Sequence, residues 1–377
     1  MADTNSDLRQ LAVSGIRRFN ALASAVPGCV KLTLGEPEFD TPAPVKEAVS
    51  RSLAEGQTHY PPNNGKKELR EAISAYMRGQ WLDYGAEDII VACGATEALS
   101  ATLLALLDPG DEVVVPTPAF GLYETIVRAA HGRVRALDTT GSGFAIDEGA
   151  LRSAMGERTK AIIVTSPNNP TGCVYGPDSL DAVARVAAER GLFVVCDDVY
   201  NRLCYLDGFQ RLAARHPELK DQLVVVDSFS KPWAMTGWRI GWLAAAPALR
   251  EQVEKMHQYL ISSIPAFVQD AAVVALGCDP APMLETYRRR RDVVCERLGA
   301  MGLPLTRPEG AFYVFPDVRG LGMASEELCE RLVREAGVAC VPGECFGAPG
   351  FMRLSYCVSD DQLELGLDRI ESFVSGL

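Results

Sequence analysis

Five short apolar runs rich in β-branched residues recur through the first two-thirds of the sequence, each separated from the next by a helical pattern or a turn. They are DIIVAC (88–93), DEVVVP (111–116), KAIIVT (160–165), LFVVC (192–196) and LVVVDS (223–228). Continuous apolar strands that alternate with helices are typical of a parallel sheet buried on both faces. The pattern therefore predicts an α/β fold with a mostly parallel sheet covered by helices.

The texture changes after residue 245, where long helical patterns replace the short strands. The last part of the chain contains the runs FYVFPDV, GVACVP and MRLSYC together with two helical patterns, which is an α+β texture. A chain of 377 residues is also longer than one small core absorbs. We predict a large α/β domain at 45–280 and a smaller α+β domain built from 1–44 and 281–377. The basic run at 288–291 is interpreted as a solvated helix face or as a set of ion-pair partners.

Charge and cysteine usage narrow the classes of partner and compartment. Lys plus Arg number 37 and Asp plus Glu number 49, so the net charge is −12, which disfavours nucleic acid and acidic membrane surfaces as partners. The 11 cysteines are scattered, odd in number and without a CxxC pair, and the four histidines lie far apart. These patterns argue against a disulfide framework and a metal site, and no apolar segment is long enough to span a bilayer. We expect a cytoplasmic protein.

Ligands of a parallel sheet bind at the carboxyl ends of its strands, so the turns that follow the apolar runs are informative. After the first run, Gly94, Ala95 and Thr96 open a helix directly out of a strand. The free amides and the positive dipole end of such a helix can bind a phosphate. Turns of this kind are also common as plain tight connections, so both interpretations stay open.

Two further turns carry polar residues. SPNNPTG (166–172) follows the third run, and DDVY (197–200) follows the fourth. The asparagines and prolines could be turn chemistry alone, and the acidic residue could simply cap the next element. A carboxylate and a phenol three residues apart can also face a common ligand.

The stretch SFSKPWAMTGWRIGW (228–242) is the most informative in the chain. It places two hydroxyls, Lys231 and Arg239 among aromatic and small residues that would exclude water. Desolvation and nearby cations would lower the pKa of Lys231, as a Schiff-base amine requires. Arg353 lies within the apolar run MRLSYC, where its charge needs an anion from the protein or from a ligand. No dinucleotide fingerprint, P-loop, HExxH or GxSxG motif is present.

These motifs together resemble those of the class I and II aminotransferases, such as aspartate and aromatic aminotransferases. Enzymes of this family depend on pyridoxal 5'-phosphate and have the architecture known as fold type I of the enzymes that use this cofactor. The resemblance runs from GIRRFNALAS and LTLGEPEFDTP to MRLSYC, with NNPTG, DDVY and SFSK in matching order. It implies a large domain with a mostly parallel, seven-stranded-type sheet flanked by helices, plus a small α+β domain.

The resemblance implies a role for each residue of the cofactor site. Lys231 would bind the cofactor as a Schiff base and carry the proton, and Asp197 would pair with the pyridine nitrogen. Tyr200 and Asn169 would hold the ring 3'-oxygen, and Phe120 would stack on the ring. The phosphate would be held by Gly94, Ala95, Thr96, Ser228, Ser230 and Arg239.

The resemblance also implies how substrate and subunits are arranged. Arg353 would bind the substrate carboxylate, helped by Asn169 and the backbone of Gly35. Tyr60 would reach the phosphate of a neighbouring subunit, which implies a homodimer with shared active sites.

The activity implied is transfer of an amino group from an L-amino acid to a 2-oxo acid by ping-pong chemistry through pyridoxal and pyridoxamine phosphate. A C–S lyase or an aminocyclopropane-carboxylate-synthase-like lyase is the alternative, since these enzymes share the motifs. A non-catalytic regulatory module that binds the cofactor is a further alternative, although the net charge of −12 and the lack of a helix-turn-helix segment argue against it.

The expected substrates are aromatic or broad in range. In one bacterial aspartate aminotransferase subgroup, a lysine at the position of Thr96 binds the distal carboxylate of the substrate. Another subgroup uses an arginine from the partner chain instead. Thr96 is not basic, and HQYLISSIPAF (257–267) contains no arginine. PTPAF (116–120) and ISSIPAF (261–267) favour bulky apolar side chains, with glutamate and 2-oxoglutarate as a shared pair.

Overall fold

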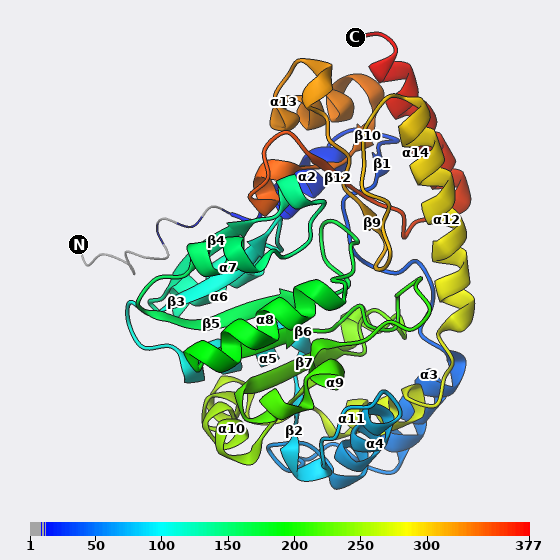
Figure 1. The fold of residues 1–377 in the computed structure, drawn as a ribbon. Coiled ribbons are helices and arrows are strands. Elements are labelled where there is room, and N and C mark those ends of the chain that lie inside the picture. Colours follow the sequence, from blue (N-terminus) through cyan, green and yellow to red (C-terminus); the bar gives the residue numbers. More distant parts are fainter. Residues whose placement is uncertain (1–8, 10, 12) are drawn as a thin grey trace, which may run out of the picture.

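The structure is a computed structural model that describes residue 9, residue 11 and residues 13–377. A central sheet of seven strands occupies the middle of the molecule (Figure 1). Its strands are β2 (Ile89–Ala92), β3 (Glu112–Thr117), β4 (Arg133–Asp138), β5 (Thr159–Thr165), β6 (Phe193–Asp197), β7 (Leu223–Ser228) and β8 (Gly241–Ala245). The spatial order is β2-β8-β7-β6-β5-β3-β4, and only β8 runs antiparallel to its neighbours. The predicted fold class is confirmed.

The five apolar runs form β2, β3, β5, β6 and β7, while β4 and β8 were not anticipated as strands. The edge strand β4 has the sequence RVRALD and exposes most of its side chains, so it carries no continuous apolar run. Strand β8 is fully buried, but its residues GWLAA begin within the stretch that contains Lys231, whose polar residues indicate a ligand-binding turn rather than a strand.

Helices cover both faces of the sheet. On one face α5 (Gly94–Leu106), α6 (Leu122–Ala129) and α10 (Pro247–Ile261) share an apolar core with the strands. The other core receives side chains from α3 (Ala43–Ala54), α4 (Lys67–Arg78), α7 (Glu148–Ala154), α8 (Pro177–Arg190), α9 (Leu212–Arg215) and α11 (Ala266–Ala275). In β5, Ile162 and Val164 enter the second core whereas Ala161 and Ile163 enter the first. This alternation explains why the strands read as unbroken apolar runs.

The N-terminal and C-terminal parts of the chain form smaller sheets beside the central one. Strand β1 (Val30–Lys31) pairs with β10 (Val338–Ala339), and β11 (Val341–Pro342), β12 (Met352–Ser355) and β9 (Tyr313–Val314) form an antiparallel sheet. Around them lie α2 (Gly15–Ser24), α12 (Ala281–Ala300), α13 (Ser325–Arg331) and α14 (Asp360–Val374), as Figure 1 shows.

A separate core joins these terminal elements. The boundary of the large domain at 45–280 stays a prediction, and the first eight residues of the predicted small domain lie outside the described residues. Over the described part of the chain, no helix is both long enough and apolar enough to cross a membrane.

The basic run at 288–291 lies on α12 and forms ion pairs. The interpretation as a solvated face is wrong for Arg290 and Arg291, which are only 5% and 9% exposed. Arg290 donates to Asp360 at 2.7 Å and also pairs with Glu38. The run therefore ties α12 to α14 and to the N-terminal segment.

Candidate active site

A cavity of about 270 Å³ lies at the carboxyl ends of the central strands, between them and the small sheet. Twelve of the predicted site residues line it: Gly35, Ala95, Thr96, Phe120, Asn169, Asp197, Tyr200, Ser228, Ser230, Lys231, Arg239 and Arg353. Gly94 lies directly behind this lining. Tyr60 is 88% exposed and does not reach the cavity of its own chain.

The turn from β2 into α5 forms a cradle for an anion. Gly94 adopts a φ of 71°, and a side chain there would place its Cβ 2.9 Å from the Arg239 guanidinium. Only glycine therefore lets this arginine approach the start of the helix. Ser228 and Ser230 also line the cavity, and the hydroxyl of Ser228 donates to that of Ser230 at 2.9 Å. Helix amides, hydroxyls and a guanidinium together suit a phosphate group.

Asp197 ends β6 and lines the cavity, and one of its carboxylate oxygens has no hydrogen-bond partner among the described residues. Its Oδ2 accepts a hydrogen bond from the Tyr123 hydroxyl at 2.7 Å, and the same hydroxyl lies 2.7 Å from the Thr165 hydroxyl. Its Oδ1 is buried and has no hydrogen-bond partner among the described residues. Burial raises the pKa of Asp197 to about 6, and the hydrogen bond from Tyr123 opposes that rise. The free oxygen is suited to a cationic N–H donor from a ligand.

Lys231 follows β7 and points into the same cavity. Its Nζ donates to the carbonyl of Gly35 at 2.5 Å. Burial lowers the pKa of Lys231 to about 8, and the positive charges of Arg239 and Arg353 act in the same direction. At neutral pH the unprotonated fraction of an amine with this pKa is far larger than that of an ordinary lysine, so more of it is available as a nucleophile and base.

The lowered pKa of Lys231 predicts its labelling by acetic anhydride. Only the neutral amine reacts, so the rate should rise with pH around a midpoint near 8 rather than the ordinary 10.5. Trace labelling of the protein freed of bound small molecules, followed by mass spectrometry of the Lys231 peptide, measures this midpoint. N-acetyl-lysine methyl amide in the same tube serves as the internal control. A Lys231 midpoint equal to that of the control would contradict the prediction.

Arg353 lies in β12 and is only 1% exposed. Its guanidinium donates to Asn169 Oδ1 at 2.8 Å and to the carbonyl of Thr33 at 2.5 Å. It also stacks against the rings of Tyr313 and Phe346, at 4.5 and 4.8 Å from their centroids. Its Nε has no partner, and within the described chain its hydrogen bonds go to an amide oxygen and a backbone carbonyl rather than to a carboxylate. A buried guanidinium of this kind is suited to the carboxylate of a ligand.

Sequence reasoning missed two tyrosines that the structure places in the cavity lining. Tyr123 contacts Asp197, and the Tyr313 hydroxyl lies 2.9 Å from that of Tyr200. A Cβ on Gly35 would lie 1.8 Å from the Tyr313 hydroxyl, so glycine is needed there as well. Tyr313 stands in the apolar run AFYVFP and Tyr123 on the buried face of an amphipathic helix, so both resemble ordinary core residues. The spacing of Tyr123 three residues after Phe120 was the one available signal, because it puts both aromatic rings near the start of α6.

Phe120 lines the cavity with its ring 6.2 Å from that of Tyr123, and the two rings are nearly perpendicular.

Among the described residues, no cluster of three or more His, Cys, Asp or Glu side chains could hold a metal ion.

Comparison with known proteins shows the same architecture elsewhere. A family model for the class I and II aminotransferases matches residues 27–370. The aspartate aminotransferase of Thermotoga maritima is 37% identical over 374 residues, covering 98% of each chain. The aspartate/prephenate aminotransferase of Thermus thermophilus is 41% identical over 351 residues, covering 90% of this chain and 89% of that one. The solved structure of an aromatic aminotransferase from Pyrococcus horikoshii has a TM-score of 0.90 at 36% identity, covering 95% of this chain and 99% of that one.

Proposed function

The chain belongs to the class I and II aminotransferases, and we propose that it takes the amino group from an L-amino acid with a bulky, uncharged side chain. It is an enzyme that uses pyridoxal 5'-phosphate and transfers the amino group to a 2-oxo acid. The observation that carries the proposal is one cavity that joins the Lys231 amine, the free oxygen of Asp197 and the buried guanidinium of Arg353.

The residues of the cavity fit pyridoxal phosphate. The unpartnered Oδ1 of Asp197 would accept the N–H of the pyridine ring, and the Gly94 turn with Ser228 and Arg239 would hold the phosphate. When bound, this cofactor supplies a conjugated ring that takes up the electron pair left at the substrate Cα when its proton departs. Asp197 would keep the ring nitrogen protonated, because a buried carboxylate favours a cation beside it.

Proton transfer falls to Lys231. Its Nζ would take the proton from the Cα of the amino acid and, in the second half-reaction, return a proton to the Cα derived from the 2-oxo acid. Burial and nearby cations lower the pKa of this amine to about 8, so a substantial fraction of it is deprotonated slightly above neutral pH, as a general base requires. Tyr200 and Asn169 would donate to, or accept from, the oxygen substituent of the ring.

Arg353 would bind the α-carboxylate that every amino acid and 2-oxo acid substrate carries. The guanidinium is held in place by Asn169 and by the carbonyl of Thr33, so it is oriented before the substrate arrives. Orientation in advance lowers the entropy cost of binding and fixes the Cα near Lys231.

The preference for an uncharged side chain follows from the cations in the cavity. Among the described residues that line it, the cations are Lys231, Arg239 and Arg353. Each has a proposed partner in the cofactor or the α-carboxylate, so this chain leaves no cation for a second carboxylate. The remaining lining includes Ile16, Leu99 and Leu122, which are apolar. The similarity to an aromatic aminotransferase from Pyrococcus horikoshii supports the same preference.

A substrate screen tests the proposed reaction. Purified protein with pyridoxal phosphate is incubated with phenylalanine, leucine or aspartate as donor and with 2-oxoglutarate or pyruvate as acceptor. We expect reciprocal formation of the 2-oxo acid and the new amino acid, fastest with the bulky apolar donors. Release of ammonia without any acceptor would instead support a lyase, and a clear preference for aspartate would contradict the proposed specificity.

We also propose that two copies of the chain form a homodimer in which Tyr60 completes the neighbouring site. Tyr60, Tyr259 and Leu260 are exposed on the surface of this chain. The segments that carry them lie together, because the carbonyl of Asn63 is 2.9 Å from His257 Nε2. Exposed aromatic residues on adjoining segments are typical of an interface.

Mixing one inactive and one weakened variant tests the shared site. Lys231→Ala should abolish activity, and Tyr60→Ala should weaken cofactor binding and lower kcat/KM by about tenfold through loss of a charge-assisted hydrogen bond. In a mixed dimer one site carries both defects, whereas the other has its own Lys231 and receives an intact Tyr60. Refolding the two variants together should therefore restore activity above the level of either alone. Absence of any gain, with mixed dimers demonstrated by differential tags, would contradict the shared site.

We propose a cytoplasmic location for the enzyme. All 11 cysteines are free thiols, and five of them are buried. A protein with so many unpaired cysteines is typical of a reducing compartment.

A further inference from the structure

A buried charged cluster lies next to the turns that carry the active-site residues. It consists of Arg211, Asp198 and Asp227, each at most 5% exposed, with Asn201 beside them. The Arg211 guanidinium donates to Asp198 Oδ2 at 2.7 Å and to Asp227 Oδ2 at 3.3 Å. The Asn201 amide donates to Asp227 Oδ2 and to the carbonyl of Asp198, both at 2.7 Å. None of these four residues lines the active-site cavity.

Each acceptor of this cluster is a direct chain neighbour of a residue in the site. Asp198 follows Asp197, and Asp227 precedes Ser228 and lies four residues before Lys231. The backbone reinforces the link, since the Ser228 amide donates to Asp227 Oδ1 at 2.7 Å. The cluster therefore bridges the ends of β6 and β7, the two strands that supply the carboxylate and the amine of the site.

Asn201 extends this arrangement, because it directly follows Tyr200. Asp198, Asn201 and Asp227 are therefore each the direct chain neighbour of a residue that lines the cavity. A rotation or shift of any one of them would move a cavity residue by way of a single peptide unit.

We propose that Arg211 is a positioning residue for the active site. By binding both aspartates, it sets the separation of the carboxyl ends of β6 and β7, and so aligns Asp197, Ser228 and Lys231 with the cofactor. The inference rests on the proposed cofactor site. Arg211 lies outside the cavity lining, and although its guanidinium also donates to Gln80 Oε1 at 2.7 Å, its link to the site runs through the two aspartates.

The charge balance explains why an arginine is required there. Two buried carboxylates repel each other, and a guanidinium can bind both at once through separate N–H groups. Burial, together with the charge of Asp198, raises the pKa of Asp227 to about 7, although the charge of Arg211 opposes the rise. Without the guanidinium the two carboxylates would separate or one would take up a proton, and either response would shift the turns.

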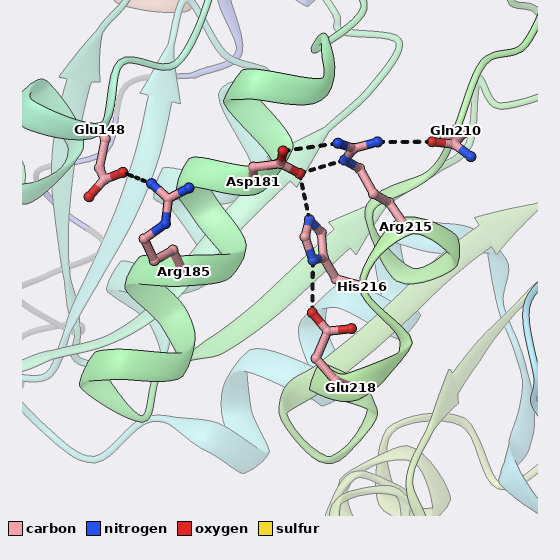
Figure 2. A network of polar contacts seen from close by, with 7 residues as sticks. All are labelled: Glu148, Asp181, Arg185, Gln210, Arg215, His216 and Glu218. Carbon is pink, nitrogen blue, oxygen red and sulfur yellow. Dashed lines mark hydrogen bonds and ion pairs between the residues drawn. The ribbon is translucent and has the colours of Figure 1, made fainter.

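The same short helix offers a matched control. Arg211 directly precedes α9, and Arg215 is its last residue. Figure 2 shows that Arg215 faces Asp181 and Gln210 in a surface network that also contains His216 and Glu218. Arg215 makes a two-pronged contact with Asp181, as Arg211 does with its two aspartates, but no member of its network neighbours a cavity residue.

The test compares how Arg211→Gln and Arg215→Gln hold pyridoxal phosphate. Both variants are loaded with the cofactor, and two quantities are measured: its dissociation rate, and the visible circular dichroism per bound cofactor, which reports the orientation of its ring. Arg211→Gln should release the cofactor on the order of 10-fold faster and lose much of the dichroism. Arg215→Gln should match the wild type in both, even if its melting temperature falls.

Asp227→Asn provides a second variant that keeps the shape of the side chain. It should remain folded and show an intermediate change in both quantities, because asparagine still accepts from Arg211 but without charge. If Arg211→Gln does not fold, Asp227→Asn decides the question. Wild-type dissociation and dichroism in whichever of these variants folds would overturn the proposal. Failure of the wild type itself to bind pyridoxal phosphate would instead refute the cofactor site.

Discussion

Lys231→Ala is expected to abolish the Schiff-base absorption band of the bound cofactor and to lower the rate of amino transfer by at least about 10³-fold. Lys231 is the one lysine among the described residues that line the cavity, so no neighbouring amine can replace it. The substitution should leave phosphate binding largely intact, since the Gly94 turn, Ser228 and Arg239 are unchanged. Cofactor should therefore still bind, but without a covalent bond.

Spectra and single-turnover kinetics of the Lys231→Ala protein measure both effects. Lys67→Ala is the matched control, because Lys67 lies on α4 with 72% of its side chain exposed and pairs only with Glu71. That variant should behave as the wild type. Retention of the Schiff-base band and of rapid transfer in Lys231→Ala would show that another group performs the chemistry.

Arg353→Gln is expected to lower kcat/KM for amino acids by about 10²- to 10³-fold, the usual cost of losing a buried charge-assisted pair. The fold should tolerate this change better than most losses of a buried arginine. No carboxylate of the described chain is left without its partner, and the glutamine amide can still donate to Asn169 or to the carbonyl of Thr33. The free energy of unfolding should therefore stay close to that of the wild type.

Substrate comparison separates carboxylate binding from a general defect. The residual reaction of phenethylamine, which lacks the α-carboxylate of phenylalanine, should be the same in wild type and Arg353→Gln. Arg334→Gln is the control variant, since Arg334 has 65% of its side chain exposed. Equal losses with phenylalanine and phenethylamine would argue that Arg353 supports the structure of the site rather than the carboxylate.

The central sheet could be predicted because burial on both faces leaves a strong signal in the strands. Runs such as KAIIVT have no polar side, and each is bounded by a turn. Strand β4 escaped this reasoning because an edge strand needs only one apolar contact, and β8 escaped it because its residues adjoin the Lys231 motif. Local pattern also could not show that the N-terminal segment pairs with a strand more than 300 residues away.

The site divides in the same way. Asn169, Asp197 and Lys231 each follow an apolar run, so topology alone brings them to one edge of the sheet. Arg353 and Gly35 join them only through the tertiary fold, and their expected roles came from the resemblance to a family. Arg211 gave no signal, because a charged residue before a short helix looks like a solvated one until its burial is known.

The long-range contacts of the N-terminal segment with Lys231 and Arg353 affect the order in which the active site forms during synthesis. Thr33 and Arg353 contact each other across 320 residues of sequence, and Gly35 meets Lys231 across 196. The central sheet can assemble while synthesis continues, since its strands end at Ala245. The carboxylate pocket cannot form at that stage, because Arg353 lies in β12, which is synthesised well after Ala245. A nascent chain halted before β12 should therefore possess the amine without the guanidinium, and full binding competence should arise only after β12 has been added.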